Sequence, residues 1–431
     1  MKNVWIVVVL VLIGGLIVWL STVIQPISTP SEKPAVAESQ KAPEAQPVSA
    51  PQPVAAKAEP SPSRKQLDDI FNKGLKYFVS KQLSDGAFPD LEGKSDVAFT
   101  AMGLIILAES PEDTRKQYQV QIVSAVNYIL PRQEPTGAVI DAKKFPAFEI
   151  YKTSLALVAL KTVQPFMEKS VADRIEPVVK KATDYLTKSQ YGPESADKDF
   201  GGWGYDEKKG NPNANLSTTA YAMDALHLAG LAKDSDTYKR AVEFLAKIQD
   251  SSEYNKFRAT ENTGGFAYSP VESKGGEKTT PDGKKVLVPY GSMTYAGLKS
   301  FIYAYIDKND PRVQAAYNWI RLNYTLDENP GLRTDAEPNL GKQGLFYYYH
   351  TFAKSLDAYG EKTLVTADPS VVPAGKKEHL WANELVDKLA VMQKPDGSWS
   401  NEVSRWWEDF APLATSYSLM SLNICRKWTG D

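Results

Sequence analysis

The octapeptide "QKPDGSWS" (residues 393–400) joins a glutamine, a glycine-containing turn and a tryptophan, and the chain repeats this combination. The glutamine ends a stretch with one apolar stripe, which predicts an amphipathic helix. A glycine turn with a following aromatic or apolar residue comes next, because glycine supplies backbone freedom and the large side chain packs the turn down. The corresponding positions are Gln82, Gln133, Gln190, Gln249, Tyr324 and Gln393.

A second predicted helix follows each turn and begins with a threonine. These stretches are apolar nearly all round, which is typical of helices buried on both sides. The threonines are 53, 66, 75, 57 and 64 residues apart, which is too far for two-helix solenoid repeats of the tetratricopeptide or ankyrin type. Six amphipathic and six apolar helices predict an all-α (α/α)6 toroid, with an open solenoid as the alternative. The threonines are Thr100, Thr153, Thr219, Thr294, Thr351 and Thr415.

The connections that lead into the apolar helices are the variable ones, and insertions on one face usually mark a binding face. The N-termini of the apolar helices would gather there with unpaired N–H groups. Such a face can hold a phosphate or diphosphate, and Arg333, Arg405 and Lys152 lie in the right segments to help.

The N-terminal residues differ from the rest of the chain. Residues 4–24 carry no charge and are long enough to cross a bilayer, so we predict a transmembrane signal-anchor helix at 1–25, with a cleaved signal peptide as the alternative. Residues 26–63 are rich in Pro, Ala and Ser and predict a disordered linker. The toroid is expected at 64–431, on the extracytoplasmic side, either periplasmic or at the cell surface.

Charge and cysteine content exclude several classes of protein. The chain has 50 basic and 52 acidic residues without a basic block, so a nucleic-acid partner is not expected. Cys425 is the only cysteine, which rules out an intrachain disulfide and a Cys-rich metal site. We expect no metal and no other cofactor.

The repeats resemble the prenyltransferase and squalene-cyclase repeat family, best at Gln393, Gly397 and Trp399, over residues 67–425. The resemblance implies an (α/α)6 barrel whose apolar central cavity takes an isoprenoid chain. The Asp-x-Asp-Asp motif of the terpene cyclases is absent from the sequence. The zinc ligands of the protein prenyltransferases do not carry over either, because Cys425 lies inside the sixth apolar helix. The family's catalytic residues therefore cannot be assigned here.

The stretch "GLFYYYHT" (344–351) is the densest candidate site. Its tyrosines, Tyr347, Tyr348 and Tyr349, would line a ligand site on the variable face, and His350 would act as an acid or base. The structural alternative is that the tyrosines pack a turn and His350 makes a hydrogen bond within it.

Aromatic residues in the other turns extend the predicted ligand wall, which suits an apolar chain or the face of a sugar. In "EVSRWWEDFAP" (402–412), Arg405, Glu408 and Asp409 would form a charged rim, and the alternative is a packed loop that closes the ring. The ligand-binding candidates are Trp203, Tyr205, Phe266, Tyr268, Trp399, Trp406 and Trp407.

Loop carboxylates supply the remaining candidates. Asp335 and Asp409 are our catalytic candidates beside His350, and Asp96, Asp206 and Glu337 occupy comparable loop positions. Two carboxylates across one groove would suit glycan chemistry, whereas most acids in loops are simply solvated.

Three functions remain open at this point. The first is a membrane-anchored toroid that binds an apolar, isoprenoid-like or lipid ligand in its cavity, with catalysis unproven. The second is a carbohydrate-active or glycan-binding barrel of the cell envelope. The third is a non-enzymatic module that binds a protein partner, which predicts a filled centre and exposed apolar residues on the loops.

Overall fold

A computed structural model describes residues 64–141, 148–206, 213–368 and 375–430. The chain divides into two units, residues 1–57 and 58–431, and all described residues belong to the second. The predicted anchor and linker lie outside the described residues. In the described ranges, no helix combines the length and the apolar character that a membrane span requires.

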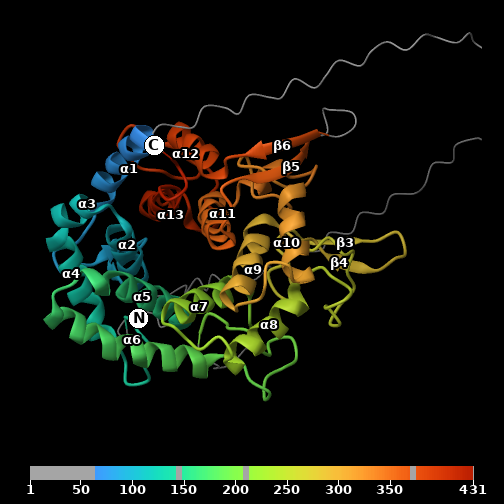
Figure 1. Cartoon of the computed structure of the whole chain (residues 1–431), viewed down its shortest axis with the longest axis horizontal. Coiled ribbons are helices and arrows are strands. Elements are labelled where there is room, and N and C mark those ends of the chain that lie inside the picture. The colour runs from blue at the N-terminus through green and yellow to red at the C-terminus, as the bar shows by residue number, and fades with distance from the viewer. Residues whose placement is uncertain (1–63, 142–147, 207–212, 369–374, 431) are drawn as a thin grey trace, which may run out of the picture. The chain divides into compact units, whose positions relative to one another are not determined.

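In the part of the chain that the structure describes, two sets of six α-helices form the fold, and Figure 1 shows their arrangement. The inner helices are α2 (Val97–Glu109), α5 (Glu149–Val163), α7 (Leu216–Leu228), α9 (Gly291–Tyr303), α11 (Leu345–Tyr359) and α13 (Ala411–Cys425). The outer helices are α1 (Arg64–Val79), α4 (Gln119–Ile129), α6 (Lys169–Ser189), α8 (Asp236–Ile248), α10 (Pro311–Leu322) and α12 (Trp381–Met392). A short helix, α3 (Glu112–Gln117), precedes α4.

The inner helices form a closed ring. Each contacts the next along the chain, and α13 returns to contact α2. The first outer helix, α1, packs against α12 and α13, so the blue and red ends of the domain lie side by side in Figure 1. The Gln393 amide seals this junction by donating to the carbonyl of Ile70 at 2.8 Å. The toroid that the sequence predicts is confirmed, and the open solenoid is excluded.

The repeated glutamines join successive outer helices. The side-chain amide of Gln190 donates to the carbonyl of Gly201 in its own turn and to that of Thr237 at the start of the next outer helix, at 2.8 and 2.9 Å. The same pair of bonds recurs at Gln82, Gln133, Gln249 and Gln393. One side chain therefore satisfies two backbone carbonyls at each of these five corners, which explains why this residue type repeats.

Glycine is required in these turns because the next outer helix passes very close to the backbone of the turn. Gly201 has a φ of +88°, and a Cβ there would lie 2.0 Å from the carbonyl oxygen of Arg240. Gly264 shows the same arrangement, with a Cβ position 2.3 Å from the Ala315 carbonyl oxygen. Both the backbone angle and the space exclude a side chain.

The repeated threonines lie inside the inner helices, not at their first residue as the sequence suggests: Thr351 lies nearly two turns inside and the other five about one turn. The Thr219 hydroxyl accepts from the backbone N–H of Trp203 at 3.1 Å, and Thr415 accepts from Trp399 at 3.0 Å. Thr100, Thr153 and Thr294 bind their turns in the same way. These five threonines thus fix a turn to the inner helix that follows it, whereas Thr351 donates to the carbonyls of Tyr347 and Tyr348 in its own helix.

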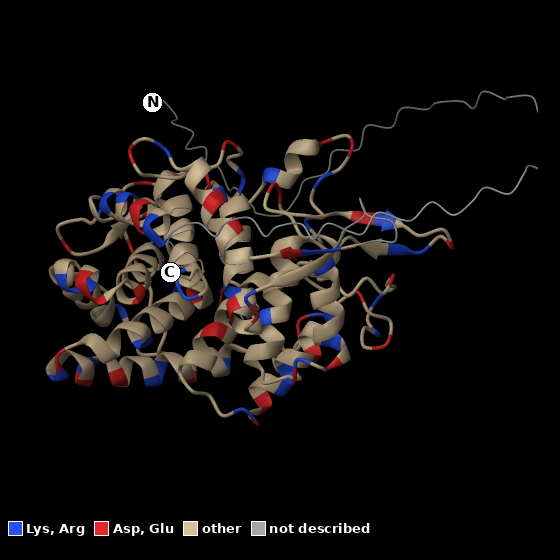
Figure 2. Cartoon of the chain, turned by 45° about the horizontal axis from the view of Figure 1, so that its top comes forward, with Lys and Arg blue, Asp and Glu red and all other residues tan. Residues whose placement is uncertain are grey.

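Three antiparallel hairpins among the described residues qualify the all-α prediction. They are β1–β2 (Phe88–Pro89, Ser95–Asp96), β3–β4 (Glu277–Thr279, Lys285–Leu287) and β5–β6 (Leu364–Asp368, Gly375–His379). The first two lie in connections that lead into inner helices, where insertions are expected. The third lies in the opposite connection, between α11 and α12, and projects beside α10 in Figure 1. Figure 2 shows basic and acidic residues interspersed over the helices and hairpins.

Candidate functional site

We call the end of the ring at which the inner helices begin the loop face; it comprises the described parts of the connections that precede α2, α5, α7, α9, α11 and α13. Side chains of the protein itself already cap several of these helix N-termini. Asp96 accepts from Ala98 N–H at 2.8 Å, Asp141 from Val97 N–H at 2.9 Å, and Asn329 from Ser292 N–H at 2.9 Å. These N–H groups are therefore not available to the predicted phosphate site, because each already donates to a carboxylate or amide oxygen of the protein.

The N-terminus of α11 is capped by Glu408, which is 1% exposed. Its carboxylate accepts from the backbone N–H groups of Phe346 and Tyr347 at 3.1 and 2.7 Å, and from the Asn401 amide at 2.9 Å. Burial raises the Glu408 pKa to about 7 against the effect of these donors. Glu408 therefore clamps the 401–410 loop onto α11 and titrates near neutrality.

This clamped loop presents two tryptophans in an unfavourable backbone conformation. Trp406 and Trp407 have φ values of +59° and +62°, and Phe148 at the start of α5 has +71°. Residues with a side chain seldom adopt this region, so strained aromatic residues gather on the loop face. Trp407 is 43% exposed, and the guanidinium of Arg405 lies 5.0 Å from the Trp406 ring. Because Trp407 remains so exposed, burial of its side chain does not compensate for its strained backbone.

Below the loop face, tyrosines from four inner helices meet at the barrel axis. The hydroxyl groups of Tyr151 on α5 and Tyr417 on α13 lie 3.5 Å apart. The Tyr347 hydroxyl of α11 lies 3.0 Å from Ser217 Oγ of α7, and the rings of Tyr221 and Tyr347 are 6.5 Å apart. These contacts join helices that are not neighbours in the ring, so side chains fill the axis at this level.

A buried charge cluster fills the axis further along the inner helices. Asp224 on α7 meets Lys299 on α9 through Oδ1 at 2.6 Å and Lys354 on α11 through Oδ2 at 2.7 Å. Burial opposes the charge of Asp224, but the two lysines outweigh it and lower its pKa. Burial also lowers the Lys299 pKa, to about 8, against the attraction of Asp224.

His350 lies between the two levels, one helical turn before Lys354. It is 6% exposed, stacks on Tyr417 at 5.8 Å, and its Nδ1 has no hydrogen-bond partner. Burial and the charges of Lys354 and Lys299 lower its pKa to about 3, which keeps the imidazole neutral. It is therefore poorly placed to act as a base near pH 7 unless a ligand changes its surroundings.

The resemblance implies an open apolar cavity, and the described residues depart from this expectation. Tyrosine hydroxyls, one aspartate and two lysines occupy the axis where an isoprenoid chain would lie. The sequence contains a sign of this polar axis. The inner-helix segments "TAYAMDAL" and "TYAGLKSF" each carry one charged residue, Asp224 and Lys299, within an otherwise apolar run.

The predicted ligand-binding residues fall into two groups. Tyr205, Trp406 and Trp407 are at least partly exposed on the loop face, and the Tyr205 hydroxyl lies 2.8 Å from that of Tyr268. Tyr347 is partly exposed too, but it lies among the tyrosines of the axis. The others are buried between inner and outer helices, where the tryptophan N–H groups donate to carbonyls of the outer helices. This buried group comprises Trp203, Phe266, Tyr348, Tyr349 and Trp399, and Tyr268 is also buried, with its hydroxyl against Tyr205.

The acidic candidates do not gather into a pair. Asp335 and Asp409 are exposed on loops, away from the buried surroundings of His350. Asp96 pairs with Lys152 at 2.8 Å, and Asp206 accepts from the backbone N–H of Phe148 at 2.7 Å, so both serve the structure. Among the described residues, no three His, Cys, Asp or Glu side chains are grouped so that they could hold a metal ion.

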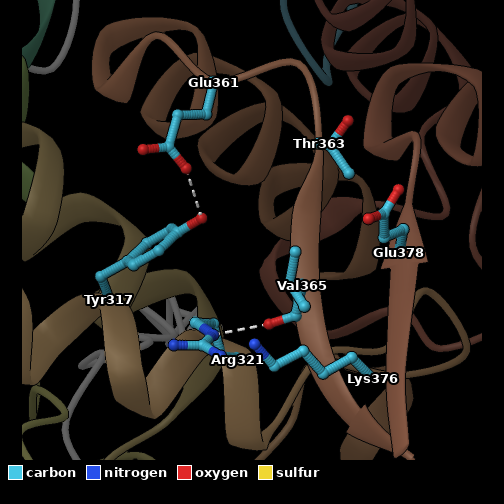
Figure 3. Close-up of a pocket in the computed structure, with 7 residues that line it drawn as sticks. All are labelled: Tyr317, Arg321, Glu361, Thr363, Val365, Lys376 and Glu378. Atoms are coloured by element: carbon cyan, nitrogen blue, oxygen red, sulfur yellow. Dashed lines mark hydrogen bonds between the residues drawn. The ribbon is translucent and has the colours of Figure 1, made fainter.

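The fifth repeat, which has Tyr324 instead of glutamine, forms a polar cavity of about 370 Å³ on the outer wall (Figure 3). The cavity lies between α10 and the β5–β6 hairpin. The Tyr317 hydroxyl donates to Glu361 at 2.9 Å, and Arg321 Nε donates to the Val365 carbonyl at 2.5 Å. Lys376 and Glu378 complete the opposite wall in Figure 3.

A hydrogen-bonded chain replaces the missing glutamine in that repeat. Glu384 accepts from the Tyr324 hydroxyl at 2.7 Å and lies 2.9 Å from His379 Nδ1. His379 Nε2 lies 3.0 Å from Thr366 Oγ1 on β5. This chain ties the hairpin to α10 and α12, which is a sufficient structural reason for these polar residues.

Comparisons with known proteins agree with this architecture. Residues 90–268 match the family model described as the squalene-hopene cyclase C-terminal domain. No curated protein sequence gives a match.

Several solved structures are similar to the chain. A family 76 α-mannanase of Bacteroides thetaiotaomicron matches with a TM-score of 0.53 and 10% identity, over 84% of this chain and 96% of that one. An α-1,6-mannanase of Salegentibacter in complex with α-1,6-mannotetrose gives 0.52 and 11%, over 84% and 99%. The type II terpene cyclase MstE from Scytonema gives 0.49 and 14%, over 85% and 100%. At such identities, likeness concerns the fold.

Proposed function

We propose that this chain, a squalene-cyclase-like α/α toroid, is a recognition domain that binds a glycan on its loop face. The observation that carries the proposal is the contrast between a filled axis and a loop face with exposed aromatic residues. A cyclase needs an apolar cavity, and polar side chains take that space here. The isoprenoid-like ligand stays a prediction. The side chains that fill the axis argue against it.

The aromatic residues of the loop face suit a sugar. Trp407 offers an exposed ring, and the partly exposed Trp406 and Tyr205 add aromatic surface to the same face. A pyranose ring presents an apolar face for stacking and hydroxyls for hydrogen bonds, which these side chains complement. The strained backbone at Trp406, Trp407 and Phe148 supports a binding role, because such strain persists at functional sites.

Mannan-degrading enzymes are among the proteins that share the fold, and this led us to include mannan fragments among the ligands to test. The absence of a carboxylate pair among our candidates favours binding over hydrolysis, since glycosidases place two carboxyl groups across the scissile bond. We further propose that residues 1–25 tether the domain to a membrane through the 26–63 linker, with the toroid in the envelope.

A second candidate function is protein recognition by the same face. Leu91 and Val271, in the connections before α2 and α9, are 44% and 54% exposed, and Trp407 is 43% exposed. Three large apolar side chains on connections of one face fit a protein partner as well as a sugar.

The experiment is a titration of the full-length chain with soluble mannan, β-glucan and peptidoglycan fragments, followed by tryptophan fluorescence. Glycan recognition predicts saturable quenching with at least one class, which Trp407→Gly weakens about tenfold or more. Val120→Ala is the matched control, because Val120 is 74% exposed at the start of α4, at the end of the ring opposite the loop face. Quenching that Tyr417→Phe abolishes and Trp407→Gly spares would place the ligand in the axis and contradict the proposal.

A further inference from the structure

The end of the ring opposite the loop face contains a second cavity, of about 520 Å³, between the start of α8 and the end of α9. Its lining includes Tyr238, Val242, Ala304, Tyr305 and Ile306, with Lys233, Asp234 and Lys239 at its polar part. None of these residues belongs to the loop face or to the axis clusters. The cavity therefore needs its own explanation.

Tyr305 is the unusual residue of this cavity. It follows the C-terminus of α9 with a φ of +59°, its N–H donating to the Ile302 carbonyl while the Ile306 N–H donates to the Phe301 carbonyl. The end of α7 has the same two bonds, and there the left-handed residue is Gly230. The α11 helix also ends in a left-handed glycine, Gly360. A tyrosine thus occupies a position for which glycine is the strongly preferred residue.

Burial does not explain that tyrosine, because its side chain is 48% exposed. Its ring lies edge-on to Tyr238 at 5.8 Å and tilted against His227 at 5.2 Å. His227 in turn stacks on Tyr303 at 4.4 Å. These four rings form an aromatic shelf that begins at the cavity and ends at Tyr303, whose ring lies 5.7 Å from Lys299 Nζ.

Tyr238 adds an unused polar group to the shelf. The residue is 2% exposed and lines the cavity, and its hydroxyl has no hydrogen-bond partner. Buried hydroxyl groups almost always have a partner, so a missing partner points to an absent ligand or water. At the rim, Lys239 pairs with Asp236 at 2.8 Å, whereas Lys233 forms no ion pair with any described residue.

We propose that this cavity binds a ring-shaped ligand that has one apolar face and a carboxylate, the chemistry shared by acidic sugars and aromatic carboxylates. Its flat face stacks on Tyr305, an oxygen of the ligand accepts from the Tyr238 hydroxyl, and the carboxylate pairs with Lys233. The proposal does not rest on the glycan site, because the two sites use different residues at opposite ends of the ring.

The experiment titrates the full-length protein by calorimetry with two probes, oligogalacturonate and 4-hydroxybenzoate. Saturable binding of either one is expected, and the stronger probe identifies the source of the ligand. Tyr305→Gly should weaken that binding about tenfold while it keeps or raises the melting temperature, because glycine relieves the left-handed strain. Tyr238→Phe should weaken it about three- to tenfold, and Lys233→Ala about threefold at low salt.

The controls separate this site from the loop face. Trp407→Gly should leave the affinity for the two probes unchanged, and Tyr305→Gly should leave the tryptophan quenching by neutral glycans unchanged. Absence of binding by both probes up to about 10 mM would overturn the proposal. Binding that Tyr305→Gly does not weaken would overturn it equally, since the shelf would then be no part of the site.

Discussion

The barrel axis and the loop face are built on the same inner helices, yet they treat polar and aromatic side chains in opposite ways. At the axis, Asp224 pairs with two lysines, and tyrosine hydroxyls reach across the ring. On the loop face, Trp406 and Trp407 accept a strained backbone, and Trp407 gains little burial. The axis side chains therefore hold the inner helices together, whereas the loop face keeps aromatic residues that are at least partly exposed. Substitutions in the two regions should therefore differ in kind.

The largest effect is expected at the centre of the axis. Asp224→Ala leaves the buried Lys299 and the partly exposed Lys354 without their partner and should lower the free energy of unfolding by about 3–5 kcal/mol. Chemical denaturation measures it. The exposed Asp335→Ala is the control and should change stability by less than about 0.5 kcal/mol.

A compensated variant sharpens this prediction. Combining Asp224→Leu, Lys299→Met and Lys354→Met removes all three charges together and should recover most of the lost stability. If Asp224→Ala were as stable as the parent chain, the axis cluster would be solvated, and the filled-axis account would fail.

The next effect is a pH dependence at the clamp between the two regions. Burial raises the Glu408 pKa from 4.5 to about 7. A carboxyl group with a raised folded-state pKa stabilises most at low pH, so its contribution should fall as the pH rises from about 4.5 to 7, by about 3 kcal/mol at most.

Denaturation curves across that range measure the effect, with Glu408→Gln as the comparison. The glutamine variant should lack this component of the pH dependence. The opposite result would be a parent chain whose stability rises with pH through the same window, with the rise absent in Glu408→Gln. That result would show that Glu408 ionises more easily in the folded state than in the unfolded state, and it would contradict the prediction.

Two tyrosines of the axis form a matched pair with a smaller effect. The Tyr347 hydroxyl lies 3.0 Å from Ser217 Oγ, whereas the Tyr221 hydroxyl lies near that of Tyr151 but has no partner at normal hydrogen-bond geometry. Tyr347→Phe should cost about 1 kcal/mol of stability, and Tyr221→Phe should be neutral or slightly stabilising. Equal costs in thermal denaturation would indicate that water, not Ser217, satisfies both hydroxyls.

The smallest stability change is expected on the loop face. In Trp407→Gly, relief of the left-handed strain offsets the greater freedom of glycine in the unfolded chain, so the free energy of unfolding should change by less than about 1 kcal/mol. Ligand binding should nevertheless fall, as in the titration described above. A loss of several kcal/mol would assign Trp407 to packing and remove it from the site.

The sequence predicted the ring because each repeated residue meets a local structural requirement, and that requirement recurs from one repeat to the next. Gln190 and Gly201 meet requirements that recur at other corners, so the same letters recur at comparable spacing. Tyr324 takes the place of the glutamine in the fifth repeat, and its ring packs against His379. His379 lies on the β5–β6 hairpin, and no periodicity in the sequence predicts that these two strands pair.

The site was harder to predict, because it depends on which side chains meet across the ring. Glu408 and Asp409 are adjacent in the sequence, yet one caps α11 from a buried position and the other is exposed. The meeting of Tyr151 with Tyr417 spans most of the chain and follows only from closure of the ring. Single charges inside apolar runs, such as Asp224, were the available signal for a polar axis.

The most direct test of the filled axis is to purify residues 64–431 and identify small molecules in an organic extract by mass spectrometry. The account predicts that no isoprenoid or other lipid accompanies the domain in stoichiometric amount, because side chains occupy the place where it would bind. One equivalent of such a molecule, retained by the parent domain, would contradict the account.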